Sequence, residues 1–84
     1  FEPGDSGLSV YPNPSAGPLT VETREELTNA TVTLFTLTGQ VLFSETVPVF
    51  SERKFLDLPL APGLYFLEVR AGAFRQLRRI LVQR

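Results

Sequence analysis

The 84-residue sequence contains no cysteine, no histidine, no tryptophan and no methionine. Without cysteine, a disulfide framework and a thiol nucleophile are excluded. Histidine is the commonest general base near neutral pH and, with cysteine, a usual ligand of zinc and copper, so His-based triads and such metal sites are excluded as well. The sequence therefore predicts a protein that is not an enzyme and needs no cofactor.

Long apolar runs are also missing, because purely apolar stretches span only a few residues. A membrane-spanning helix needs about 20 such residues, so no transmembrane segment is expected. The length allows one small domain with little core to spare for a cavity. The sequence starts at Phe1 without a methionine, and we expect a module cut from a longer polypeptide.

The charges are divided unevenly along the chain. Residues 1–69 carry nine acidic and three basic residues, whereas residues 70–84 carry five arginines and no acid. One interpretation is a solvated strand face whose arginines pair with the acidic remainder, and the other is a recognition tag. Nucleic acid is not an expected partner, because the acidic remainder would repel phosphates and aromatic residues do not interleave with the arginines. The arginines are Arg70, Arg75, Arg78, Arg79 and Arg84.

Short apolar runs separated by turn residues predict β-strands throughout, and no helical period is sustained over three turns. Seven antiparallel strands in a chain this short bury their apolar faces best as two packed sheets, which predicts an all-β, immunoglobulin-like antiparallel β-sandwich of about seven strands. The expected strands are 8–11, 19–22, 30–37, 40–47, 55–58, 64–70 and 74–82.

Several positions carry more specific expectations. Gly39 can supply the positive φ of a hairpin turn, and we expect the same of Gly63 after Pro62. The apolar phase changes between Leu34 and Phe35, which either a β-bulge or a strand buried on both faces would explain. The last hairpin, strands 64–70 and 74–82, is expected to have an apolar inner face and a cationic outer face.

The two tyrosines are both expected to be core residues. Tyr65 alternates in phase with Leu67 and Val69, which predicts a buried ring whose hydroxyl bonds to the backbone, and we expect the same of Tyr11. With tryptophan absent, neither supplies the exposed aromatic platform that sugar-binding modules commonly use.

Four segments together resemble a known family. They are "VYPNPSAGPLTVE", "VTLFTLTGQVLFSETV", "LDLPLAPGLYFLEVRAG" and the basic, apolar end "RQLRRILVQR". In this order they resemble the C-terminal sorting domain of the bacterial type IX (Por) secretion system. On this resemblance residues 8–84 are the sorting domain, and residues 1–7, rich in glycine and polar residues, are a linker from a preceding cargo domain.

The resemblance implies a function and a set of residues. Such domains are immunoglobulin-like sandwiches that direct a fused cargo across the outer membrane of Bacteroidetes-type bacteria, from the periplasm to the cell surface or the medium. The partners implied are the outer-membrane translocon and a sortase-type protease that cleaves the domain off and attaches the cargo to lipopolysaccharide. The resemblance assigns structural motif roles to Tyr11, Pro12, Asn13, Pro14, Gly39 and Pro62, and secretion recognition to Gly63, Tyr65, Arg75, Arg78, Arg79, Ile80 and Val82.

A different class of function remains open from the sequence. An immunoglobulin-like accessory or adhesive module of a cell-surface enzyme would have the same fold and composition. The two hypotheses differ in that a sorting domain acts at the end of its cargo and is absent from the mature product, whereas an accessory module persists.

Overall fold

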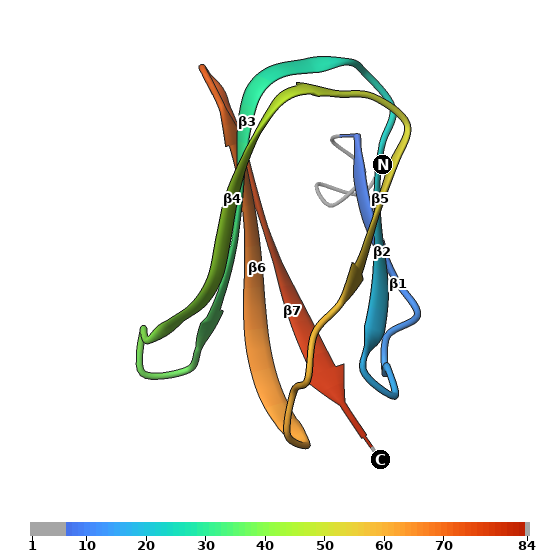
Figure 1. The fold of residues 1–84 in the computed structure, drawn as a ribbon, viewed down its shortest axis with the longest axis vertical. Helices are drawn as coiled ribbons and strands as arrows, with labels where there is room; N and C mark the ends of the chain where they lie inside the picture. Colours follow the sequence, from blue (N-terminus) through green and yellow to red (C-terminus); the bar gives the residue numbers. More distant parts are fainter. Residues whose placement is uncertain (1–6, 84) are drawn as a thin grey trace.

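The computed structural model describes residues 7–83, and over these residues the chain forms seven strands without a helix (Figure 1). All seven predicted strands are present, and only their ends differ from the prediction. The expected linker lies outside the described residues except for Gly7. The strands are β1 (Leu8–Tyr11), β2 (Pro18–Thr23), β3 (Leu27–Thr36), β4 (Val41–Phe50), β5 (Arg53–Asp57), β6 (Gly63–Ala71) and β7 (Phe74–Val82).

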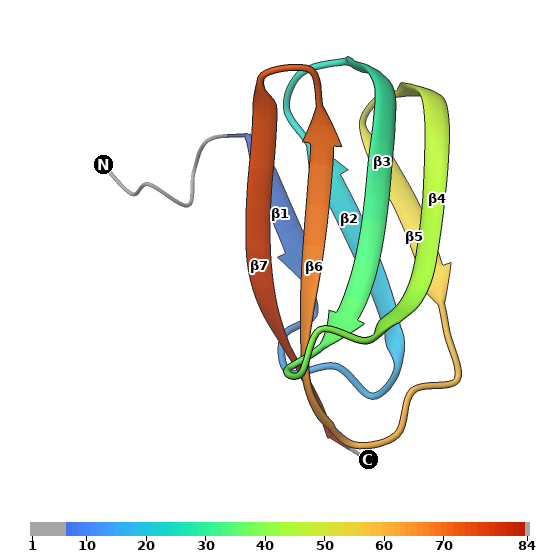
Figure 2. The same cartoon turned by 90° about the vertical axis from the view of Figure 1, so that its left-hand side faces the viewer.

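The strands form two antiparallel sheets that face each other, which confirms the predicted β-sandwich (Figures 1 and 2). One sheet has the order β1-β2-β5 and the other the order β4-β3-β6-β7. We call them the three-stranded and the four-stranded sheet. Strand β7 is therefore an edge strand of the four-stranded sheet, with β6 as its only strand neighbour there. Within residues 7–83 no helix capable of crossing a membrane is present.

The core lies between the sheets and follows the two-residue alternation of the strands. Side chains at every second position of β2, β3, β6 and the end of β7 point inward and are almost fully buried. Each buried Val, Leu, Ile or Phe side chain contributes about 1.5–3 kcal/mol to folding, so this layer supplies most of the stability. The core residues are Leu8, Leu19, Val21, Leu27, Ala30, Val32, Leu34, Phe50, Leu56, Leu60, Tyr65, Leu67, Val69, Ile80 and Val82.

The β3–β4 hairpin contains a tight turn and a β-bulge. Gly39 has a φ of +95° and its N–H donates to Thr36 O at 2.9 Å, as expected for a tight turn. Leu34 pairs with Phe43 but Phe35 pairs with Val41, so Leu42 is the extra residue of a β-bulge. Of the two predicted features, the bulge is present, but it lies on β4. Strand β3 keeps its alternation, with Leu34 buried and the Phe35 ring stacked on Phe66.

Strands β3 and β4 are longer than predicted because they curve over one end of the sandwich (Figure 1). Leu27 and Phe50 pair at this end, and both side chains are buried. The residues just before Ala30 are polar, so the apolar pattern did not predict a strand there. In the structure β3 begins three residues earlier, at Leu27, whose side chain is buried.

The side of the sandwich between β4 and β5 is closed by one ion pair. Lys54 Nζ lies 3.0 Å from Glu45 Oε1, and both side chains are partly exposed. These residues come from different sheets, so the pair spans the opening between them.

Candidate recognition surface on the last hairpin

Strands β6 and β7 pair along their whole length, from Gly63 opposite Val82 to Ala71 opposite Phe74. Ile80 and Val82 point into the core and are buried, as the sequence predicted. The opposite face of the hairpin is turned to solvent. This outer face carries Leu64, Phe66, Glu68 and Arg70 on β6, and Arg75, Leu77, Arg79 and Leu81 on β7.

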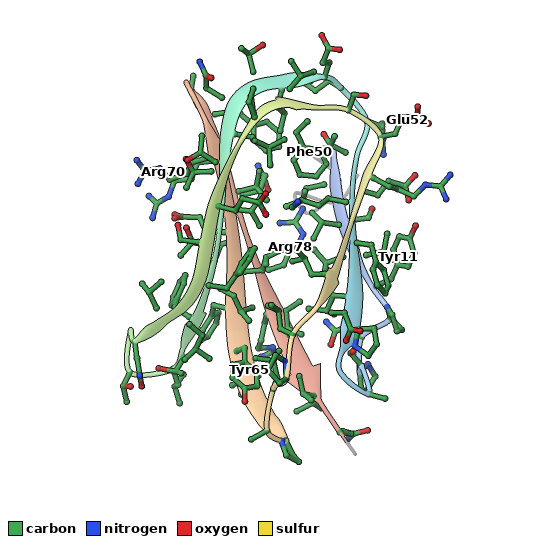
Figure 3. The ribbon with its side chains drawn as sticks, in the orientation of Figure 1. Tyr11, Phe50, Glu52, Tyr65, Arg70 and Arg78 are labelled. Carbon is green, nitrogen blue, oxygen red and sulfur yellow. The ribbon has the colours of Figure 1, made fainter. Side chains whose placement is uncertain are left out.

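Two of the arginines on β7 lie on this outer face, and only one has an acidic partner. Arg75 Nε donates to Glu68 Oε2 at 2.6 Å, which forms an ion pair across the hairpin. Arg70 lies directly opposite Arg75, and Figure 3 shows it pointing away from the sandwich. Arg79 makes no side-chain hydrogen bond or ion pair with any residue that the structure describes.

Arg78 does not lie on the outer face of the hairpin, where the sequence predicted the arginines, so that prediction is wrong for this residue. It shares the inward phase of Ile80 and Val82, and Figure 3 shows it between the two sheets. Its Nη2 donates to Leu8 O at 3.0 Å, and its Nη1 donates to Leu77 O at 3.0 Å and to Gln76 Oε1 at 3.1 Å. The guanidinium therefore joins β7 to β1 across the side of the sandwich opposite the Lys54–Glu45 pair.

The segment Asn13–Ser15 covers the outer edge of the second half of β7. The Asn13 carboxamide donates from Nδ2 to Arg79 O at 2.7 Å and accepts from Leu81 N at 3.0 Å. The Asn13 side chain thus makes the two hydrogen bonds to β7 that the main chain of a residue on a neighbouring strand would make. We call this set of contacts the clasp.

Ser15 continues the clasp with its main chain. Its N–H donates to Leu81 O, and its carbonyl accepts from Gln83 N, both at 2.8 Å, in a short parallel bridge. The Ser15 side chain is buried, donates to Pro18 O at 2.6 Å and accepts from Gly17 N at 2.9 Å, which holds the loop itself in shape. Polar groups of Asn13 and Ser15 therefore satisfy a strand edge that would otherwise be open to other chains.

Tyr11 is not the core residue that we predicted. It is 39% exposed on the outer face of the three-stranded sheet, and its hydroxyl donates to Glu22 Oε1 at 2.8 Å (Figure 3). Leu8 and Val10 take the inward phase of β1, which leaves Tyr11 outside. The hydrogen bond to the Glu22 carboxylate, more than partial desolvation, raises the pKa of the Tyr11 phenol above its usual value.

Tyr65 and Gly63 build the turn that leads into β6. Tyr65 is buried, and its hydroxyl donates to Ala61 O at 2.5 Å, as predicted for a core ring with a backbone partner. Gly63 has a φ of +156°, a positive value as predicted, and a Cβ at this position would contact the Tyr65 ring at 3.9 Å. Tyr65 is buried and Gly63 is half-buried, and their predicted role in secretion recognition stays a prediction.

A family model described as "Secretion system C-terminal sorting domain" matches residues 9–83, which is nearly the whole chain. The chain belongs to this family. No curated protein matches it.

Sorting domains of this family are signals for the type IX secretion system and are in general non-catalytic. The family therefore implies export to the cell surface or the extracellular space, with the secretion machinery and a fused cargo as interaction partners. Over residues 7–83, no group of three or more His, Cys, Asp or Glu side chains is placed to hold a metal ion.

The motifs of the sorting domain meet in space in a way that the sequence did not reveal. The Tyr-Pro-Asn-Pro motif contributes Asn13 to the edge of β7, while the Pro-Gly-x-Tyr motif contributes the strand that pairs with it. The role of Ser15 was missed, and no local pattern would have shown it. The inward direction of Arg78 was also missed, although its two-residue spacing from Ile80 and Val82 indicates it.

Proposed function

We propose that this domain directs a cargo protein, fused before it, from the periplasm across the outer membrane through the type IX translocon. A sortase-type protease then cleaves the chain before the domain and attaches the cargo to lipopolysaccharide on the cell surface. The family match over residues 9–83 supports the sorting role. Cargo, cleavage and anchoring are the part of the proposal that extends beyond the family assignment.

The observation that carries the proposal is the clasp between residues 13–15 and β7. The last strand of the chain is held by a segment far from it in sequence, so the outer face of the hairpin exists only in the folded domain. We therefore propose that the machinery recognises this outer face, with Arg75 and Arg79 in direct contact. Gly63, Tyr65, Arg78, Ile80 and Val82 act by holding the hairpin in place.

The test uses a fluorescent protein placed behind a periplasmic export signal and before residues 1–84, in a bacterium with a type IX system. We expect the reporter in the medium or on the cell surface, and deletion of residues 75–84 should retain it inside the cell. Secretion unaffected by that deletion would overturn the proposal. A reporter retained in the periplasm although the domain is folded would instead support an accessory or adhesive module.

A charge-matched comparison separates recognition from folding. The double variant Arg75→Gln/Arg79→Gln removes the outer charges of β7 but leaves its backbone contacts, so we expect a folded domain with impaired secretion. Arg24→Gln/Arg53→Gln, which removes two exposed arginines outside the last hairpin, is the control and should be secreted normally. Equal secretion of both variants would exclude the outer arginines as the recognised groups.

A further inference from the structure

The three arginines between residues 75 and 79 occupy different environments. Arg75 is paired with Glu68, and Arg78 is turned inward toward Leu8. Arg79 is exposed and its side chain has no hydrogen-bond or ion-pair partner among residues 7–83. Of the three, Arg79 is therefore the one whose guanidinium can bind an anionic group of another molecule.

Arg79 borders a hollow on the outer face, at the clasped end of β7. The hollow has a volume of about 360 Å³ and is lined by Asn13, Pro14, Leu64, Arg79 and Leu81. Leu64 and Leu81 lie directly opposite each other and are 36% and 37% exposed. One cation therefore stands beside a small apolar surface, a combination that fits an apolar side chain next to an anionic one.

The lining of the hollow is held in place by the clasp. Asn13 binds the main chain of both Arg79 and Leu81, so its own position and that of β7 along the hollow are fixed by hydrogen bonds at 2.7 Å and 3.0 Å. A preformed site loses less conformational entropy on binding than a mobile one. The Arg79 side chain takes no part in these bonds and stays available to a ligand.

The size and charge of the site favour a peptide over a lipid surface. Electrostatic binding to anionic membranes typically uses clusters of about 4–8 basic residues. Among the described residues the outer face carries Arg70, Arg75 and Arg79, which are fewer than such a cluster, and Glu68 neutralises Arg75. Arg78 faces inward, and Arg79 is the arginine that lines the hollow. A single arginine with two leucines instead matches one carboxylate and one apolar side chain.

We propose that Arg79 and the hollow formed with Asn13, Pro14, Leu64 and Leu81 bind an acidic side chain flanked by an apolar one, on an exposed segment of a partner protein. This inference rests on the proposed function in taking that partner to be a component of the secretion machinery. The carboxylate pairs with the Arg79 guanidinium, and the apolar neighbour covers Leu64 and Leu81. The site thus assigns different roles to arginines that look equivalent in the sequence.

The test is an NMR titration of the ¹⁵N-labelled domain with the peptide acetyl-Gly-Leu-Glu-Leu-Gly-amide. We expect shift changes centred on the amides of Leu64, Arg79 and Leu81, and weaker binding at higher salt. Replacing the peptide glutamate by glutamine should weaken binding about fivefold, a factor equivalent to about 1 kcal/mol.

Two variants of the domain provide the matched comparison. Arg79→Gln should weaken binding of the glutamate peptide about fivefold and keep the fold, because Asn13 bonds to the main chain of residue 79. Arg53→Gln should bind as the unchanged domain does, since Arg53 is exposed on the outer face of the three-stranded sheet and does not line the hollow. Shift changes elsewhere, or equal binding by Arg79→Gln, would overturn the proposal.

Two further outcomes identify what has failed. Arg79-dependent binding to phosphatidylglycerol vesicles, without binding to the peptide, would overturn the peptide site in favour of a lipid. Peptide binding at the hollow without secretion of the reporter fusion would support the site but overturn the sorting function. Secretion that depends on residues 75–84, without peptide binding, would overturn the site alone.

Discussion

The two open sides of the sandwich are closed by different means. Between β4 and β5, one partly exposed Lys54–Glu45 ion pair spans the gap. Between β7 and β1, Arg78 reaches the carbonyl of Leu8, and the clasp pairs residues 13–15 with β7. An exposed ion pair contributes about 0–1 kcal/mol, whereas each hydrogen bond of the clasp contributes about 1 kcal/mol. The side that carries the last strand is therefore the more firmly fixed.

This difference has a structural reason. Strand β4 resists the addition of another strand through its bulge and through Pro48, which lacks an N–H donor. Strand β7 has neither a proline nor a bulge along its pairing with β6, so its edge is protected by groups from elsewhere in the chain. The β6–β7 hairpin thus depends on distant residues in a way that β4 does not.

Gly63→Val should have the largest effect on the β7 side. A β-branched residue at a φ of +156° is strained, even though a Cβ there would make only an ordinary contact with the Tyr65 ring. We expect a loss of about 3 kcal/mol in the free energy of unfolding, measured by urea denaturation. Gly72→Asn is the control, because its φ of +60° suits asparagine and the space around it is open. An unchanged midpoint for Gly63→Val would show that the turn does not require glycine.

Asn13→Ala should rank second, with a loss of about 2 kcal/mol, since it removes both hydrogen bonds of the carboxamide. Hydrogen exchange at the Leu81 amide should become faster, while the Gln83 amide stays protected by Ser15 O. Asn13→Asp keeps the acceptor for Leu81 N but not the donor to Arg79 O, so an intermediate loss is expected. Unaltered exchange at Leu81 in Asn13→Ala would contradict the clasp.

Arg78→Met should cost about 1 kcal/mol, because it retains most of the aliphatic stem and loses the bond to Leu8 O. Arg78→Lys keeps the charge but lacks the planar fork that reaches several acceptors, so a smaller loss is expected. Thermal unfolding followed by circular dichroism provides the measurement. If Arg78→Met were as stable as the original domain, the tie between β7 and β1 would be energetically unimportant.

The smallest effect is expected on the opposite side of the sandwich. Lys54→Met should change the free energy of unfolding by less than about 0.5 kcal/mol, because both side chains of the ion pair are partly exposed. A double-mutant cycle with Glu45→Gln isolates the pair itself. A coupling energy above about 1.5 kcal/mol would show that this ion pair stabilises its side of the sandwich as strongly as a hydrogen bond of the clasp stabilises the other side.

The sequence predicted the strands well because alternation is a local property. Leu19 and Val21, or Tyr65, Leu67 and Val69, point to the core in the phase that their spacing indicates. The same rule applied to β1 and β7 would have placed Tyr11 outside and Arg78 inside. Those errors came from weighing residue type above phase.

The clasp could not be predicted in the same way. Asn13 and Arg79 are separated by 66 positions, and their contact joins a side chain to a main-chain carbonyl. The hydrophobic periodicity of the sequence cannot predict such a contact, because the contact depends on how the two sheets are placed against each other. The hollow beside Arg79 has the same origin, since Asn13 and Pro14 complete a surface that β6 and β7 begin.

We propose that the last hairpin acts as a sorting signal because the folded domain holds it in place. The most direct test compares two reporter fusions in a bacterium with a type IX system, one carrying residues 8–84 and the other residues 63–84 alone. We predict secretion of the first and retention of the second, because residues 63–84 lack the clasp and the facing sheet. Equal secretion of both fusions would contradict the account and show that the machinery recognises a linear segment.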